Sequence, residues 1–338
     1  MSVCNEDKQK LQEEKRVHLT SVARFRKLHK MYASRALQGR INMLSFDYMQ
    51  NLPLSNIQTS DVFYLSQLWK YVFGIHNFSN NAVRVYAYDE THGGKGSNNV
   101  TSMLFDYFRK LPYRPLVLIC DNCTGQNKNK TLVRLLYLVV HYFKMFPKVT
   151  VLFPIRGHTY LANDRDFACI GRKKKTLAAE VPEDWYEHIR AARKQPSPFE
   201  CTVIEYDDFF NVDKSIEKFF LKTPVPAMQL KRTRMLEIEA STPDVKVRRT
   251  YTGQWMHIRI RNKTKLPREI TFLPLYDSQL QLDARKLKNM MHLSKFLKNS
   301  SSMPFYDRLT RIGNNDDDFE YEDCVILLDD DNSSADEA

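Results

Sequence analysis

The sequence lacks the long hydrophobic runs and the cysteine pattern that would indicate a membrane protein or a disulfide framework. No stretch approaches the roughly 18 uninterrupted apolar residues of a membrane-spanning helix. The first residues, MSVCNEDKQKLQEEK, contain no apolar segment of a secretory signal peptide. The six cysteines of the 338-residue chain are scattered along it. These absences predict a soluble intracellular protein with free thiols and no membrane partner.

Other motifs are also missing. The glycines of HGGKG do not have the spacing of a phosphate-binding loop. Cys120 and Cys123 form a single C-x-x-C, and no second pair has the spacing of a zinc site. A thiol redox function is therefore a third hypothesis beside the two developed below, and it requires both cysteines to be reactive.

Charge is distributed unevenly along the chain. The segment 314–338 has eleven acids and no Lys or Arg, so residues 1–313 carry all 51 basic residues and 29 acids, a net charge of about +22. Lys and Arg release condensed counterions when they neutralise phosphates. A body this basic favours a polyanionic partner, although many basic proteins bind no specific nucleic acid.

The hydrophobic pattern predicts an α/β fold. A helix is expected over 8–37 and an apolar strand over 41–52, followed by a hairpin-like pair of strands. Helices and strands then alternate, which combines an antiparallel start with a βαβ crossover. This succession is that of a ribonuclease H-like mixed sheet flanked by helices. The later expected elements are strands over 62–78, 82–90, 116–121 and 148–155 and helices over 99–111, 129–146 and 163–180.

Composition divides the chain into four parts. We expect an N-terminal helical segment over 1–40, a ribonuclease H-like core over 41–195, and a β-rich and helical extension over 196–313. Residues 314–338 read as a disordered acidic tail.

Four acids are candidates for a metal site. Asp47 lies in the first strand of the core and Asp121 directly follows the buried run LVLIC, while Asp164 and Asp166 lie at the start of a helix. In the expected strand order these positions converge at one edge of the sheet. Gathered carboxylates require a cation, and hard oxygen ligands select Mg²⁺ or Mn²⁺. Taken singly, Asp47 reads as a strand-end acid, Asp121 as a turn former and Asp164 as an N-cap.

The segments CDNCTGQNKNK and IRGHTYLANDRDF, preceded by SFDYMQNLPL and YDETHGGKGSNN, resemble an uncharacterised transposon-derived family of animal proteins with a DDE-type, ribonuclease H-like transposase domain. The resemblance covers roughly residues 15–200 and, more loosely, the helical stretch to about 312. It implies metal-dependent DNA cleavage and strand transfer, with Asp47, Asp121 and Asp166 matching the acidic triad. The chain departs from a complete transposase because it lacks a Cys/His zinc-finger spacing ahead of the core. The choice between Asp164 and Asp166 stays open.

Further residues beside the acids are candidates for contacts with DNA. His158 precedes the helix acids and could contact a phosphate or position water, or it could be a structural hydrogen bonder. The loop after Asp121 and a basic run on the following helix could contact phosphates. Turn formation, helix capping and a solvated helix face are the alternatives. These loop and helix candidates are Asn122, Gln126, Lys128, Arg172, Lys173, Lys174 and Lys175, with further basic clusters at Lys231, Arg232, Arg234 and at Lys246, Arg248, Arg249.

The acidic tail contains an apolar tetrad between acids, which favours edge-strand addition to a partner with a basic rim. It resembles a SUMO-interacting motif. The alternative is that the tetrad docks on the basic body of this protein. The tetrad consists of Val325, Ile326, Leu327 and Leu328.

Two hypotheses follow. The first is a nuclear, transposase-derived DNA-binding protein that cleaves phosphodiesters with Mg²⁺ and could act as a homodimer. The second is a catalytically silent, domesticated transposase that serves as a nuclear nucleic-acid or SUMO-binding adaptor. Metal-dependent cleavage distinguishes the two.

Overall fold

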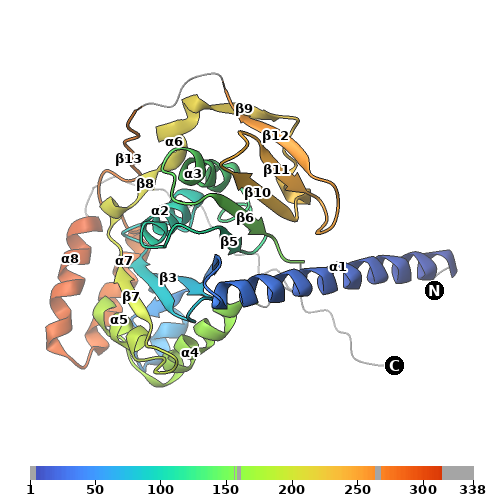
Figure 1. Ribbon diagram of the computed structural model, residues 1–338. Coiled ribbons are helices and arrows are strands. Elements are labelled where there is room, and N and C mark those ends of the chain that lie inside the picture. The colour runs from blue at the N-terminus through green and yellow to red at the C-terminus, as the bar shows by residue number, and fades with distance from the viewer. Residues whose placement is uncertain (1–4, 156, 158–160, 263–267, 314–338) are drawn as a thin grey trace.

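A computed structural model describes residues 5–155, 157, 161–262 and 268–313, with side chains placed for those between 7 and 310. The protein is an α/β protein in which helices flank both faces of a mixed sheet, as Figure 1 shows. This confirms the predicted fold class at the level of an α/β mixed sheet. Within this described part of the chain, no helix is both long and apolar enough to cross a membrane.

Five strands form the centre of the sheet, in the order β4-β3-β1-β5-β6. The strand β1 is antiparallel to β3, which is antiparallel to β4, whereas β5 runs parallel to β1 and β6 parallel to β5. Their bounds are β1 Asn42–Tyr48, β3 Leu68–Asn77, β4 Val83–Asp89, β5 Leu116–Ile119 and β6 Lys148–Leu152.

The sheet continues beyond both of these edges. On one side β7 pairs in parallel with β4, and on the other β10 pairs antiparallel with β6 and begins a run through β11 and β12 to β9. The short β2 pairs with β3, and β8 and β13 form a separate two-stranded sheet. The bounds are β2 Leu52–Leu54, β7 Glu200–Val203, β8 Phe210–Asn211, β9 Phe220–Val225, β10 Met235–Glu239, β11 Val245–Arg248, β12 Met256–Arg261 and β13 Leu273–Pro274.

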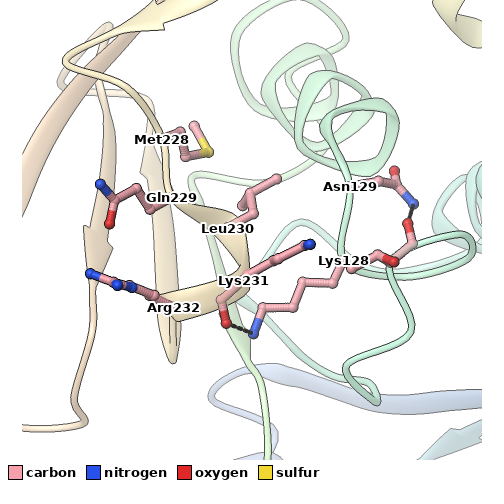
Figure 2. Close-up of a pocket in the computed structure, with 8 residues that line it drawn as sticks. Lys128, Asn129, Met228, Gln229, Leu230, Lys231 and Arg232 are labelled. Carbon is pink, nitrogen blue, oxygen red and sulfur yellow. Dashed lines mark hydrogen bonds between the residues drawn. The ribbon is translucent and has the colours of Figure 1, made fainter.

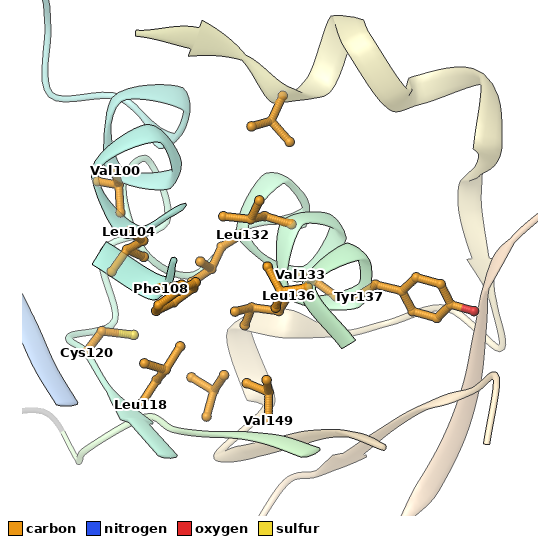
Figure 3. Close-up of a cluster of buried hydrophobic side chains, with 14 of the residues drawn as sticks. Val100, Leu104, Phe108, Leu118, Cys120, Leu132, Val133, Leu136, Tyr137 and Val149 are labelled. Carbon is orange, nitrogen blue, oxygen red and sulfur yellow. The ribbon is translucent and has the colours of Figure 1, made fainter. Parts of the chain in front are cut away.

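One face of the sheet is covered by α2 and α3. Their apolar side chains pack onto alternate residues of the strands, including Leu118 and Cys120 of the β5 region and Val149 of β6 (Figure 3). The helix α3 begins at its N-cap Asn129, whose side-chain oxygen accepts from the backbone N–H of Leu132 at 3.0 Å. Almost every residue of α3 is buried, which explains its strongly apolar sequence.

The opposite face is covered by α1 over β1 and β5, and by α4 and α5 over the β3–β4 side, where α7 and α8 join the same apolar cluster. The N-terminal half of α1 extends away from the body of the protein (Figure 1). The helix bounds are α1 Asn5–Leu37, α2 Ser97–Phe108, α3 Lys130–His141, α4 Ala162–Thr176, α5 Pro182–Arg190, α6 Val212–Ile216, α7 Ala284–Leu293 and α8 Met303–Gly313.

The expected strand over 62–78 is wrong in its first part. Residues Ser60–Phe63 form a short 3₁₀ turn, and β3 begins only at Leu68. The side-chain oxygen of Thr59 accepts from the backbone N–H of Asp61 at 3.4 Å and caps this turn. Phe63 and the adjacent Tyr64 are each 86% exposed, so the apolar letters that suggested a strand do not belong to the core.

Candidate active site

The register of β1 and β5 brings Asp47 and Asp121 to the same edge of the sheet. Ser45 of β1 lies opposite Ile119 of β5 in a parallel pair. Two residues further along each chain are Asp47 and Asp121. Because side chains alternate between the faces of a strand, both acids belong to the face that α1 and α4 cover.

Asp47 is a half-buried carboxylate in a negative environment. Burial, with the charges of Asp121 and Asp164, raises its pKa to about 7, from an ordinary value near 3.8. The backbone N–H of Tyr48 donates to Asp47 Oδ1 at 2.8 Å and opposes this shift, as does the charge of Lys95. The shift indicates that positive charge would be favoured beside Asp47.

Asp121 organises the loop between β5 and α3. Its Oδ1 accepts from the Cys123 backbone N–H at 3.0 Å and from Asn127 Nδ2 at 2.6 Å. The backbone N–H groups of Asn127 and Lys128 both donate to the carbonyl of Cys123, which tightens the loop. Asp121 therefore stabilises the turn, as its alternative role predicted. Its Oδ2 receives no hydrogen bond from a described residue.

Asp164 lies in the first turn of α4, and its side chain is exposed. The charge of Asp164 raises the pKa of Asp47, which identifies it as a neighbour of that carboxylate. A glycine, Gly74, lies opposite Asp47 in β3 and lets α4 approach the sheet closely. A Cβ at Gly74 would come within 2.7 Å of the Phe167 ring, and Asn163 Nδ2 donates to the Gly74 carbonyl at 2.9 Å.

Asp166 has different surroundings. It is 6% exposed, and its Oδ2 lies 2.8 Å from Nδ1 of His76 in β3. Its Oδ1 accepts from the guanidinium of Arg193 at 3.2 Å. Both oxygens thus have partners beneath α4. Of the two helix acids, Asp164 is the one whose charge contributes to the raised pKa of Asp47.

The donor set at this edge suits a hard cation held with help from other oxygens. No three or more His, Cys, Asp or Glu side chains of the described residues gather closely enough to hold a metal ion. Mg²⁺, however, is often bound by one or two carboxylates together with water and substrate phosphates. Asp47 and Asp121 each keep an Oδ2 without a hydrogen bond from a described residue, so this pair fits such a site.

Lys95 is a site residue that the sequence did not single out. Burial lowers its pKa, and the charges of Asp47 and then Cys123 oppose that shift, so it lies near the acids. Its Nζ donates to Asn51 Oδ1 at 2.8 Å. A cavity of about 330 Å³ opens here, lined by Gln50, Asn51, Trp69, Lys95 and Lys174. The signal in the sequence was a lysine among the glycines of HGGKG.

Two of the loop residues expected to contact DNA are engaged inside the protein. Asn122 Nδ2 donates to the Pro154 carbonyl at 2.7 Å, and Asn122 Oδ1 accepts from Lys128 Nζ at 2.7 Å. Lys128 is 3% exposed, and its ammonium lies 4.5 Å from the ring centre of Phe153. Gln126 is half-buried in the same loop.

The basic run Arg172–Lys175 forms the last turns of α4. Arg172 and Lys175 are exposed, whereas Lys173 and Lys174 are partly buried, and Lys174 lines the cavity beside Lys95. Lys174 therefore lines the same cavity as Lys95, which lies near Asp47. The expected role of the run in contacting phosphates stays a prediction.

The environment of Cys120 bears on the thiol redox hypothesis. Burial raises the pKa of the Cys120 thiol well above its ordinary value, which disfavours the thiolate that a redox function needs. His158 and the tetrad 325–328 lie outside the described residues.

A family model described as a domain of unknown function, DUF7869, matches residues 62–240. The chain belongs to the DUF7869 family. The DUF7869 segment includes Asp121 and Asp164 and extends through β10, whereas Asp47 and β1 precede it. No curated protein matches the chain.

Proposed function

We propose that this DUF7869 protein is a transposase-derived, ribonuclease H-like protein that cleaves or transfers nucleic-acid phosphodiesters with a divalent metal. The observation that carries the proposal is the shared edge position of Asp47 and Asp121, together with the raised pKa of Asp47. In the order β4-β3-β1-β5-β6, the neighbours β4, β3 and β1 pair antiparallel, whereas β5 and β6 run parallel to β1. This arrangement supports a ribonuclease H-like core.

In this proposal Asp47 and Asp121 hold Mg²⁺ or Mn²⁺ through their unengaged oxygens. When bound, such an ion would polarise a phosphodiester and lower the pKa of an attacking water. Asp164 completes the acidic edge from the first turn of α4. Asp166 is a positioning residue, because its contacts with His76 and Arg193 fix α4 against β3.

Lys95 supplies a positive charge beside the acids. Its hydrogen bond to Asn51 holds the ammonium at the cavity that Lys174 also lines. A substrate phosphate entering this cavity would meet two lysines on the way to Asp47. In the proposal these lysines orient the substrate backbone, and the carboxylates act on the scissile group.

The test is a cleavage and strand-transfer assay with supercoiled and nicked DNA in Mg²⁺ or Mn²⁺. Wild-type protein is expected to act only with metal, and Asp121→Asn is expected to abolish the activity. Thermal unfolding with and without Mg²⁺ at pH 8 supplies a second readout. The metal should raise the Tm of the wild type and not that of Asp121→Asn.

A second candidate function is a metal-independent nucleic-acid-binding adaptor. It is favoured by the finding that no three acids of the described residues gather closely enough to hold a metal ion. DNA binding without cleavage, and without a Mg²⁺-dependent change in Tm, would establish the adaptor and refute the metal-dependent enzyme.

A further inference from the structure

A second cavity lies beside the Asp121 loop and has no role in the site above. Its volume is about 620 Å³, within the usual range of roughly 300 to 1,000 Å³ for ligand pockets. It opens between the loop that precedes α3 and the segment that leads into β10 (Figure 2). Its walls are formed by Thr124, Lys128, Asn129, Met228, Gln229, Leu230, Lys231 and Arg232.

The walls combine positive charge with apolar surface. Three of the eight lining residues are cationic and none is acidic, while Met228 and Leu230 contribute apolar side chains. Lys231 and Arg232 are exposed, and neither forms an ion pair with another described residue. A phosphate matches the cations, and the flat face of a base matches the apolar wall.

Lys128 has a different role from the two exposed cations. Its Nζ donates to Asn122 Oδ1 and, at 3.5 Å, to the backbone carbonyl of Lys231, a contact visible in Figure 2. This buried lysine therefore ties the Asp121 loop to the opposite wall of the cavity. It fixes the position of Lys231 and Arg232 relative to the acidic edge.

The N-terminus of α3 also borders the cavity. Asn129 is the N-cap of this 12-residue helix, and its Nδ2 donates to the Thr124 carbonyl at 3.1 Å. The positive end of the helix dipole adds to the charge of the two exposed cations, and all three favour an anion.

We propose that this cavity binds one nucleotide of the nucleic-acid strand on which the acidic edge acts, with backbone phosphates of the strand at Lys231 and Arg232, whose side chains point in opposite directions (Figure 2), and with its base against Met228 and Leu230. The inference rests on the proposed function for the identity of the strand. One loop connects the two places, because it begins at Asp121 and ends at the cavity wall. The cavity thus selects where along a strand the phosphodiester meets Asp121.

Binding is measured by fluorescence anisotropy with a labelled single strand of DNA, in EDTA so that cleavage cannot contribute. The double variant Lys231→Ser, Arg232→Ser is compared with Lys288→Ser, Lys295→Ser, which removes two exposed cations from α7 and the turn after it. We expect at least a tenfold loss of affinity in the cavity variant and a salt dependence shallower by about one to two phosphate contacts. The control should lose much less.

A third variant tests the apolar wall. Leu230→Gln should weaken binding of the strand and leave the salt dependence unchanged, because it removes contact with the base rather than with the phosphate. Equal losses in the cavity variant and the α7 control would overturn the inference. Competition by thymidine monophosphate at the same nucleotide concentration would overturn it in favour of a free-nucleotide pocket.

Failure of this inference can be separated from failure of the proposed function. Binding is measured in EDTA and therefore does not depend on the metal that the proposed cleavage needs. A cavity variant that binds normally while the wild type cleaves DNA refutes the cavity alone. A wild type that binds through the cavity but never cleaves refutes the proposed enzyme.

Discussion

The pKa of Asp47 depends on its burial first and then on the charges around it. Its raised pKa means that the folded protein holds this proton more tightly than the unfolded chain does. The contribution of Asp47 to the free energy of unfolding therefore falls as the pH rises from about 4 to about 7, and the full destabilisation is present above that range. The same destabilisation makes the carboxylate a better partner for a cation.

Asp47→Asn should consequently stabilise the metal-free protein at pH 8, by an amount on the order of 1 to 4 kcal/mol, and should have little effect near pH 4. Urea unfolding at the two pH values, in EDTA, measures the difference. The exposed Asp207 supplies the matched control Asp207→Asn. A stabilisation equal at both pH values would contradict the assignment of the raised pKa to Asp47.

The same substitution should affect stability strongly at Asp166 and hardly at all at Asp164. Asp166→Asn weakens the contacts with His76 and Arg193, so we expect a loss of about 2 to 4 kcal/mol in the free energy of unfolding. Asp164→Asn removes an exposed charge and should change stability by less than about 0.5 kcal/mol. In the cleavage assay Asp164→Asn should lose activity at a temperature where it is fully folded. Full activity in that variant would exclude Asp164 from the acidic edge.

The approach of α4 to the sheet depends on Gly74. Gly74→Ala places a Cβ against the Phe167 ring and should destabilise the protein by about 1 to 3 kcal/mol, as overpacked sites do. Gly171→Ala is the control, because a Cβ there meets Met49 Cε only at 4.0 Å and alanine favours the helix. Thermal unfolding should show the two substitutions shifting Tm in opposite directions. A second change, Phe167→Leu, should recover part of the Gly74→Ala loss if the ring is its cause.

Glu180 binds the segment that connects α7 to α8. Its buried carboxylate accepts from the backbone N–H groups of Lys298 and Asn299 and from Ser302 Oγ, all between 2.7 and 3.2 Å. Glu180→Ala should lower the free energy of unfolding by about 2 to 4 kcal/mol, because several donors lose a charged acceptor. Limited proteolysis should then cut first between α7 and α8. Cleavage elsewhere, with that segment intact, would show that other contacts hold these helices.

Most of the order of helices and strands in the core could be predicted from apolar periodicity, whereas the shared edge position of Asp47 and Asp121 also required a ribonuclease H-like strand order to be assumed. The first acid lies in a strand and the second directly follows one, so strand order alone brings them together. The different surroundings of Asp164 and Asp166 could not be predicted, because they depend on the rotation of α4 about its axis, to which Gly74, Asn163 and Phe167 contribute through contacts distant in sequence. Periodicity also could not reveal that Lys128 is buried, because its partners come from two other segments.

The acidic segment 314–338 lowers the net charge of the whole protein. Residues 1–313 carry about +22, and the acidic segment 314–338 reduces this to +11. Removal of 314–338 should therefore strengthen binding to DNA severalfold at low salt, and the difference should shrink as the ionic strength rises. Anisotropy titrations over a salt series measure it. An unchanged affinity at low salt would contradict this expected effect of the acidic segment.

The continuity of the sheet sets conditions on how the chain can fold as it is synthesised. Both edges of the central strands are closed by segments that are synthesised much later, since β4 pairs with β7 and β6 pairs with β10. Until residue 239 has been made, β6 presents an unpaired edge to other nascent chains. Contacts this distant in sequence also slow folding. A fragment that stops near residue 195 would retain the acids but expose two open edges, so it should aggregate where the longer chain does not.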